Sequence, residues 1–337
     1  MTYGVLPIVA EAFSGTMRIV ATSSNGIQDV FAPAGPAARS IASHGLLLFT
    51  VCAIVYTLVL AALGWALIRR RHRSDESPAT ERRLGITVTA AVAISAVTLV
   101  VLLVSSIVAG RGLTSPSGAG AITIDVIGHQ WWWDFQYRDV SPSEFVTSPN
   151  ELRIPVGVPV VLKVQSRDVV HSFWVPNLHG KRDLIPGQIT HMWFQADRPG
   201  VFRGQCAEFC GHQHAKMAFT VVAEPMDAFK RWLEHQRRPA AEPDAPDRRR
   251  GQQVFLSTTC AMCHTIRGTT AASRVGPELT HIATRPTLAA GTLPNTAEHL
   301  ASWVRNPQAI KPGVRMPPAT LSAADFEAVL AYLRSLR

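Results

Sequence analysis

Two long apolar runs near the N-terminus constrain the fold of this 337-residue chain more than any other feature. Residues 41–68 and 84–108 contain no Asp, Glu, Lys or Arg. As a helix, the first run would reach about 42 Å, which is enough to cross a lipid bilayer with some tilt. We therefore expect a transmembrane helical hairpin over residues 41–110 rather than two buried core helices.

The loop between the two runs predicts how the hairpin is oriented. Arginines gather in this loop and are sparse on the outer flanks: Arg69, Arg70, Arg71, Arg73, Arg82 and Arg83 against Arg18, Arg39 and Arg111. By the positive-inside rule the loop is cytoplasmic. Residues 1–40 and everything after Arg111 are then expected on the extracytoplasmic side of the membrane. Because the membrane accounts for the basic loop, its charge gives no reason to expect a nucleic-acid partner.

The part of the chain after the hairpin divides in two by its sequence pattern. Residues 121–224 contain short runs rich in Val, Ile, Thr, Phe and Trp, broken by Pro and Gly, which is typical of an antiparallel sandwich or barrel. We expect an all-β domain over 115–235 that closes with a short helix. Residues 236–250 are dense in Pro and charge and predict a linker. Helical periodicity over 251–337 predicts an all-α domain.

The all-α domain opens with a C-x-x-C-H motif, formed by Cys260, Cys263 and His264. Two thiols at this spacing can form thioethers to the vinyl groups of a haem, and the adjacent histidine can bind the iron. A redox dithiol or half of a zinc site has the same spacing. An extracytoplasmic location and the lack of a second cysteine pair after the motif favour covalently bound haem c.

A second haem ligand is expected between two of the helical segments. Met316 is the only methionine after Met262, and a thioether suits a His/Met cytochrome. We therefore predict Met316 as the sixth ligand, with His281 and His299 as alternatives.

A separate cluster of soft ligands lies at the end of the β-rich segment. Cys206, Cys210, His214 and Met217 fall within twelve residues, and such a set on a β framework suits copper. A site with one copper needs a single cysteine, so the second cysteine suggests two copper ions bridged by both thiolates. His171 can supply a second imidazole from the preceding strand end. The alternative is an extracytoplasmic disulfide between the two cysteines.

These motifs together resemble subunit II of a haem-copper cytochrome c oxidase with a cytochrome c domain fused at its C-terminus. The resemblance covers residues 41–235 and is carried by GHQW at 128–131, DVVHSFWVP at 168–176, KRDLIPG at 181–187 and GQCAEFCGHQHAKM at 204–217. Residues 247–337 resemble a class I cytochrome c, including Gly276-Pro277-x-Leu279. The implied fold is a two-helix transmembrane hairpin, an all-β cupredoxin-like domain and an all-α cytochrome c domain.

The resemblance also implies which residues bind the cofactors. A dinuclear copper centre, CuA, would be held by His171, Cys206, the backbone carbonyl of Glu208, Cys210, His214 and Met217. The side chain of Glu208 would help to hold magnesium at the interface with subunit I. Trp131 would be the residue through which electrons enter, although tryptophans 131–133 also suit the core of the β-domain. The family's proton-channel glutamate is matched only by Glu81, which is followed by arginines rather than Trp and Pro, so no proton role is assigned to it.

Oxygen chemistry must belong to a partner protein. Reduction of oxygen at a haem and copper would need a cluster of intramembrane histidines, and the two apolar runs contain only His44. We interpret the chain as the electron-input subunit of a proton-pumping oxygen reductase. It would relay electrons from cytochrome c or another small redox donor through haem c to CuA and on to haem a of subunit I. The implied partners are oxidase subunits I and III and membrane lipid, with no nucleic acid.

Three other interpretations use some of the same features. Nitric oxide and nitrous oxide reductases carry the same CuA module, so a nitrogen oxide is the alternative terminal acceptor. A quinol-oxidase type of subunit II keeps the fold without the copper ligands, whereas all six positions are filled here. A copper carrier for oxidase assembly would have no reason to carry haem.

Overall fold

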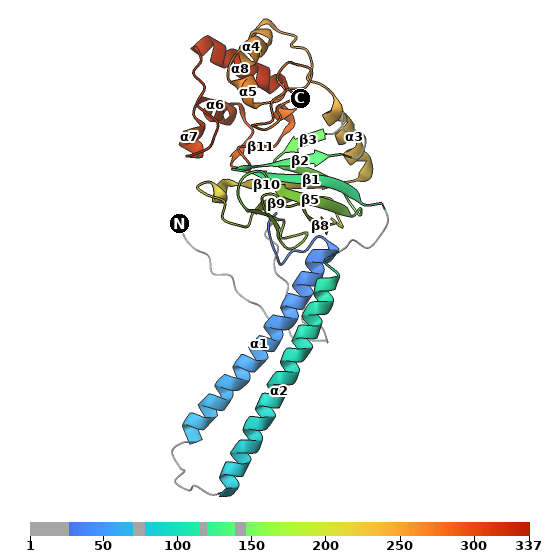
Figure 1. Ribbon diagram of the computed structural model, residues 1–337, viewed down its shortest axis with the longest axis vertical. Helices are drawn as coiled ribbons and strands as arrows, with labels where there is room; N and C mark the ends of the chain where they lie inside the picture. The colour runs from blue at the N-terminus through green and yellow to red at the C-terminus, as the bar shows by residue number, and fades with distance from the viewer. Residues whose placement is uncertain (1–26, 70–77, 115–119, 139–145) are drawn as a thin grey trace, which may run out of the picture.

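The computed structural model describes residues 27–69, 78–114, 120–138 and 146–337. Figure 1 shows a helical hairpin below a β-domain, with a helical C-terminal domain on the far side of that β-domain. This is the predicted order of a membrane hairpin, an all-β cupredoxin-like domain and an all-α cytochrome c domain.

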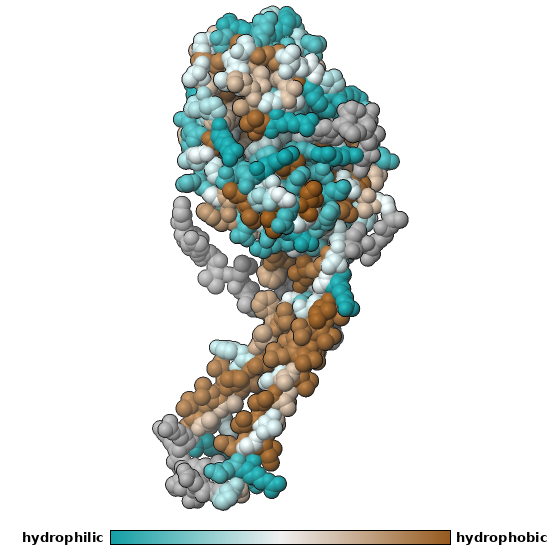
Figure 2. Space-filling model, viewed as in Figure 1, coloured by the Kyte–Doolittle hydropathy of each residue, from teal (hydrophilic) through white to brown (hydrophobic). Residues whose placement is uncertain are grey.

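The hairpin consists of α1 (Pro36–Arg69) and α2 (Pro78–Arg111). The most apolar window of each helix has a mean hydropathy of 2.7, and none of either window is buried within the protein. Figure 2 shows apolar side chains over most of the visible hairpin surface. Both helices are long and apolar enough to cross a membrane. Arg70, Arg71 and Arg73 lie outside the described residues, and the orientation of the hairpin stays a prediction.

The β-domain is built from two five-stranded sheets packed face to face. The first sheet has the order β3-β2-β1-β5-β8 and contains β1 (Ile122–His129), β2 (Trp132–Tyr137), β3 (Val146–Pro149), β5 (Val160–Ser166) and β8 (Thr190–Phe194). The second has the order β4-β10-β9-β6-β7 and contains β4 (Glu151–Pro155), β6 (His171–Trp174), β7 (Arg182–Leu184), β9 (Gly200–Cys206) and β10 (Ala218–Glu224).

The sheets are mixed, whereas the sequence predicted an antiparallel arrangement. β1 pairs with β5 in parallel, and β10 pairs with β4 in parallel, while the other pairs are antiparallel. Strands β2, β3 and β4 lie between β1 and β5 in the chain, and β4 belongs to the opposite sheet, so the chain crosses between the sheets before β5 pairs in parallel with β1. Local alternation of side chains does not record such a crossover.

Aromatic side chains from both sheets fill the space between them. Trp133 of β2 lies 5.2 Å from Phe219 of β10, and Phe219 lies 4.7 Å from Phe173 of β6, measured between ring centroids. Gly204 of β9 makes room for this contact, because a Cβ atom there would lie 2.1 Å from Cζ of Phe219. The absence of a side chain at one position thus allows three large rings to meet.

The start of α1 is fastened to the β-domain. The amide of Ala34 donates to the carbonyl of Asn177 at 2.7 Å, and the amide of Ala38 donates to the carbonyl of Leu178 at 3.2 Å. Arg39 pairs with Asp197. The hairpin is therefore attached to the edge of the β-domain by hydrogen bonds as well as by chain continuity.

The C-terminal domain is helical, as predicted. It contains α4 (Pro246–Ser257), α5 (Cys260–Cys263), α6 (Ala297–Arg305), α7 (Pro307–Ile310) and α8 (Ala323–Ser335), with two short strands, β11 (Thr287–Leu288) and β12 (Leu293–Pro294). Phe255 of α4 packs edge-on against Tyr332 of α8. Ser322 caps α8, since its side chain accepts from the amide of Asp325.

The segment between the two soluble domains is shorter than the sequence suggested. Helix α3 (Met226–Arg237) closes the β-domain, and α4 begins at Pro246, inside the stretch 236–250 that was predicted as a linker. Proline is favoured at the first position of a helix, and Asp247 follows in the first turn, where a negative charge suits the helix dipole. The Pro-rich composition that indicated a linker therefore also starts a helix.

The close approach at Gly204 leads to a stability prediction. We expect Gly204→Ala to lower the free energy of unfolding of the β-domain by about 1–3 kcal/mol, because the new methyl group must displace the Phe219 ring. Gly200→Ala on the same strand is the matched control, since its Cβ would meet Phe202 at an ordinary 3.4 Å. Urea unfolding followed by tryptophan fluorescence measures both. Equal midpoints for the two variants would show that the contact is not tight.

Candidate metal centre and haem pocket

Strand pairing brings the predicted copper ligands together. His171 is the first residue of β6 and Cys206 is the last residue of β9, and these strands pair with Phe173 opposite Cys206. The loop that follows β9 returns to β10, and the amide of Cys206 donates to the carbonyl of Met217 at 2.9 Å. The loop carrying the remaining candidate ligands is therefore closed at its base by the sheet.

The two thiols and one imidazole form the centre of this cluster. The sulfur atoms of Cys206 and Cys210 lie 3.8 Å apart and both cysteines are free. Nδ1 of His171 lies 3.8 Å from the sulfur of Cys206. All three donor atoms lie within 4.8 Å of one another and are buried. The structure holds two separate thiols here, and the alternative of a disulfide does not describe it.

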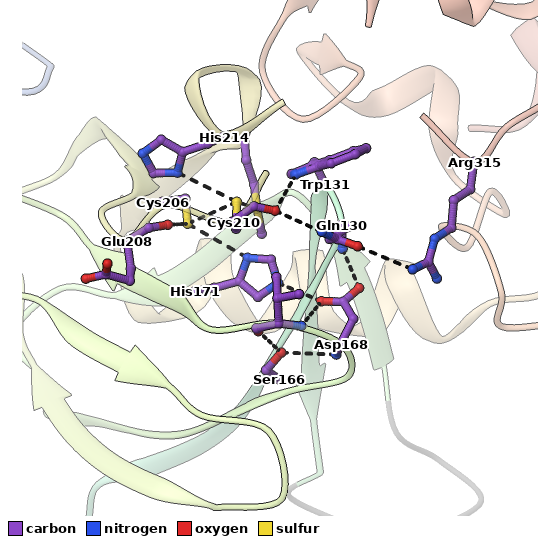
Figure 3. A network of polar contacts seen from close by, with 12 residues as sticks. Gln130, Trp131, Ser166, Asp168, His171, Cys206, Glu208, Cys210, His214 and Arg315 are labelled. Atoms are coloured by element: carbon purple, nitrogen blue, oxygen red, sulfur yellow. Dashed lines mark hydrogen bonds and ion pairs between the residues drawn. The ribbon is translucent and has the colours of Figure 1, made fainter. Parts of the chain in front are cut away.

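Three further donors surround the sulfur pair (Figure 3). Nδ1 of His214 lies 3.6 Å and Sδ of Met217 lies 3.8 Å from the sulfur of Cys210. The backbone carbonyl of Glu208 lies 3.2 Å from the sulfur of Cys206. Two thiols, two imidazoles, a thioether and a carbonyl thus converge on one buried space. This soft donor set fits copper.

The two cysteines differ in acidity because their thiols interact. The hydrogen bond between the thiols, together with the contact to His171, lowers the pKa of Cys206 to about 3, although burial acts in the other direction. The same interaction raises the pKa of the Cys210 thiol, and burial adds to that increase. A lowered pKa favours the thiolate of Cys206, and the thiolate is the form that ligates metals.

Asp168 orients the imidazole of His171. Its Oδ1 lies 2.8 Å from Nε2 of His171, and its Oδ2 accepts from the amide of Gln130 at 2.7 Å. Burial alone would raise the pKa of this carboxyl, but these hydrogen bonds lower it. With Nε2 held by a carboxylate, Nδ1 is directed at the sulfur atoms. Carboxylates play this role behind many metal-bound histidines.

The four predicted haem ligands line one cavity in the helical domain. Cys260 and Cys263 lie on α5, His264 follows it, and Met316 comes from the loop between α7 and α8. The wall between them is mostly apolar and includes Leu279, Ile282, Leu300, Val304, Val329 and Leu333. A hydrophobic cavity with two thiols, an imidazole and a thioether fits haem c.

The imidazole of His264 is already oriented for a metal. Its Nδ1 lies 2.7 Å from the carbonyl of Pro277, so the proton sits on Nδ1 and Nε2 stays free as a ligand. Burial lowers the pKa of this histidine and favours the neutral form. Gly276 allows its backbone to approach the ring, because a Cβ atom there would lie 2.7 Å from Cε1 of His264.

The β-domain supplies one wall of the same cavity. His129, Gln130, Trp131 and Trp132 line it opposite the helical domain. The indole Nε1 of Trp131 donates to the carbonyl of Cys210 at 2.9 Å, and the ring is 7 % exposed. Trp131 therefore contacts both the sulfur cluster and the haem cavity. Trp133, in contrast, is fully buried in the aromatic core, as expected for at least one of the three tryptophans.

The structure brings the predicted ligand residues together and shows supporting residues that the sequence analysis did not name. The carboxylate behind His171 was available as a signal, because Asp168 precedes it by three positions within the quoted motif. His129 stacks on Trp132 at 4.2 Å between centroids, and burial lowers the pKa of His129 to about 4, so the ring is neutral. No local pattern pointed to the shared wall of the haem cavity.

Methionine substitutions test the two ligand sets separately. We expect Met217→Leu to change the copper absorption and EPR spectrum and to leave the haem spectrum unchanged, because the thioether of Met217 lies in the sulfur cluster. Met316→Leu should do the reverse, since Met316 lines the haem cavity. Met262→Leu is the control: this side chain is 70 % exposed between the two haem cysteines. Spectra of Met217→Leu that match those of the unaltered protein would contradict the assignment.

Comparisons with known proteins agree with this geometry. Residues 122–224 match the periplasmic domain of cytochrome c oxidase subunit II, and residues 249–337 match cytochrome c. Cytochrome c oxidase subunit 2 of Alkalihalophilus pseudofirmus is 39% identical over 316 residues, covering 90% of this chain and 90% of the relative. The same subunit of Bacillus sp. strain PS3 is 31% identical over 64% of this chain and 62% of the relative.

A solved structure is also similar in part. The periplasmic domain of subunit II of cytochrome oxidase from Bradyrhizobium japonicum is 30% identical, covers 36% of this chain and 95% of its own, and has a TM-score of 0.33. The extent of the match to the Alkalihalophilus subunit decides the family. This chain belongs to the cytochrome c oxidase subunit 2 family, carries a cytochrome c domain at its C-terminus, and is therefore a subunit of an enzyme complex.

Proposed function

We propose that this chain is the electron-input subunit of a proton-pumping haem-copper oxygen reductase, and that it passes electrons from cytochrome c or another small donor through haem c to CuA and on to haem a of subunit I. The observation that carries the proposal is the position of Trp131. Its side chain lines the haem cavity and donates to the carbonyl of Cys210, so one residue links the two candidate sites.

Each cofactor has a complete set of residues to hold it. Copper would be bound by His171, Cys206, the carbonyl of Glu208, Cys210, His214 and Met217. Haem c would be bound by Cys260, Cys263, His264 and Met316. When bound, both groups supply one-electron chemistry, and their potentials are tuned by ligands, hydrogen bonds and burial.

The protein's own contribution is to hold these ligands in place and to exclude water. Asp168 fixes the ring of His171, and the carbonyl of Pro277 fixes the ring of His264. Cys206 and Cys210 are each 2% exposed, and Met217 is fully buried. Ligands held this firmly change position little when the charge of a site changes, which favours fast electron exchange.

Glu208 has two roles in the proposed function. Its backbone carbonyl faces the sulfur cluster, while its side-chain carboxylate points away from that cluster (Figure 3) and lies 3.8 Å from Nζ of Lys181. The carboxylate is 45% exposed, so it is accessible to a partner. We include in the proposal a magnesium ion at the interface with subunit I, bound in part by Glu208, because a hard cation prefers such an oxygen ligand.

The proposed function also implies a location for the chain in the cell. The two apolar helices would lie beside subunit I in a bacterial cytoplasmic membrane, with subunit III and lipid as further neighbours. Both soluble domains and both termini would lie on the periplasmic side, where a small redox donor can reach the helical domain.

Trp131 provides the test of the relay. We expect Trp131→Phe to slow electron transfer from haem c to copper by about tenfold, since the bond to Cys210 is lost, with both absorption spectra unchanged. Laser-flash reduction of the haem by an added photoreductant, followed at the copper and haem bands, measures the rate. Trp232→Phe is the control, because Trp232 packs on Tyr137 away from both sites. An unchanged rate in Trp131→Phe would refute the role of this residue.

A further inference from the structure

Lys311 has an unusual environment for a lysine. It is 1% exposed, which makes it the most buried lysine among the described residues. Burial lowers its pKa to about 7, and the nearby charge of Lys216 acts in the same direction. In the part of the chain that the structure describes, Lys311 forms no ion pair with a carboxylate. A buried cationic group without an acidic partner is costly, and neither candidate cofactor site uses this lysine as a ligand.

The amino group of Lys311 contacts three backbone carbonyls instead. Nζ donates to the carbonyl of Lys216 at 2.9 Å, of Trp131 at 3.0 Å and of Ala289 at 3.2 Å. An ammonium has three hydrogens, so each carbonyl receives one. Two of the carbonyls belong to the β-domain and one belongs to the helical domain, and Lys311 itself lies between α7 and Met316. The contact therefore crosses the boundary between the domains.

The carbonyls that Lys311 holds are next to the candidate electron path. Trp131 is the residue that contacts both sites, and Lys216 directly precedes Met217. Further hydrogen bonds flank the lysine: Gln213 donates to the carbonyl of Pro312 at 2.7 Å, and the amide of Ala218 donates to the carbonyl of Ala290 at 3.0 Å. The loop that supplies Met316 is thus tied to the loop that supplies His214 and Met217.

We propose that Lys311 is a positioning residue that locks the cytochrome c domain onto the CuA domain, with the haem cavity closed against Trp131. The inference rests on the proposed electron relay and adds a residue to it. The segment 238–245 joins α3 to α4 and is itself bonded to the helical domain, since the amide of Ala240 donates to the carbonyl of Arg267 at 2.9 Å. Lys311 adds a separate constraint beside the candidate copper loop, with three directional bonds from a single side chain.

A packing role alone does not account for this choice of residue. A leucine or methionine would fill the same space without the cost of burying an amine. It would also remove the Lys311 donor from the buried carbonyl of Trp131 and one of two donors from the carbonyls of Lys216 and Ala289, which also accept from Oγ1 of Thr292. The domains could then shift relative to each other. The single Nζ atom of Lys311 donates to all three carbonyls. A small shift of either domain therefore breaks one or more of these hydrogen bonds.

The test compares Lys311→Met with Lys230→Met in the full-length protein, purified in detergent and loaded with copper and haem. Lys230 is exposed on α3 and serves as the matched control. The first readout is hydrogen exchange of the Ala218 amide, whose bond to Ala290 crosses the interface, with the Val221 amide within the sheet as an internal reference. We expect Lys311→Met to speed exchange at Ala218 about tenfold and to leave Val221 unchanged.

The second readout is the rate of electron transfer from haem c to copper after flash reduction. We expect it to fall by about tenfold in Lys311→Met, with both spectra intact, and to stay unchanged in Lys230→Met. If Lys311 only fills space, Lys311→Met should lower the midpoint of unfolding but leave the exchange rate at Ala218 and the electron-transfer rate of the folded protein unchanged. That result would overturn the inference.

A second variant protects the test against misfolding. The exposed Lys216 donates from Nζ to the carbonyl of Ile310 at 2.5 Å across the same interface, so Lys216→Met removes one contact without disturbing the core. We expect a smaller change in the same direction, and no change would count against a lock at this surface. If the unaltered protein shows no transfer, the proposed relay fails, whereas the exchange measurements still decide the role of Lys311.

Discussion

The pairing of β6 with β9 is the constraint on which the candidate copper site depends. His171 and Cys206 are separated by 35 positions, and they meet because Phe173 pairs with Cys206 and the amide of Ala207 donates to the carbonyl of Ser172. The loop after Cys206 is then closed by its bond to Met217. Sheet hydrogen bonds thus bring donor residues from distant parts of the chain to one place.

Much of the architecture followed from local patterns. The uncharged runs predicted α1 and α2, and short runs rich in Val, Ile, Thr, Phe and Trp predicted the β-domain. These features are properties of neighbouring residues. The parallel pairs β1 with β5 and β10 with β4 were missed, because strand order is decided by contacts between distant segments. The early start of α4 at Pro246 was missed because proline both breaks and begins helices.

In the candidate sites, too, local patterns predicted some features, while contacts between distant segments decided others. Cysteine and histidine spacing predicted both candidate ligand sets, since the chemistry of thiols and imidazoles is specific to those residues. Lys311 carried no such signal: it lies 180 positions from Trp131 and belongs to a residue type that is almost always exposed. The role of Trp131 itself could be expected from the family resemblance alone, and its contact with the haem cavity required the relative position of two domains.

The covered position of Trp131 changes how such a subunit meets its redox partner. Two separate proteins associate at a rate that depends on their concentrations. The rate also depends on the ionic strength, because dissolved ions screen the charges that attract the partners. In this chain the helical domain already covers Trp131. Because it is part of the same polypeptide, its effective concentration at this surface is high and fixed. In the proposed relay, the step from haem c to copper would then be independent of ionic strength and of the concentration of a mobile donor. A salt dependence of turnover would report the encounter between that donor and the outer face of the helical domain.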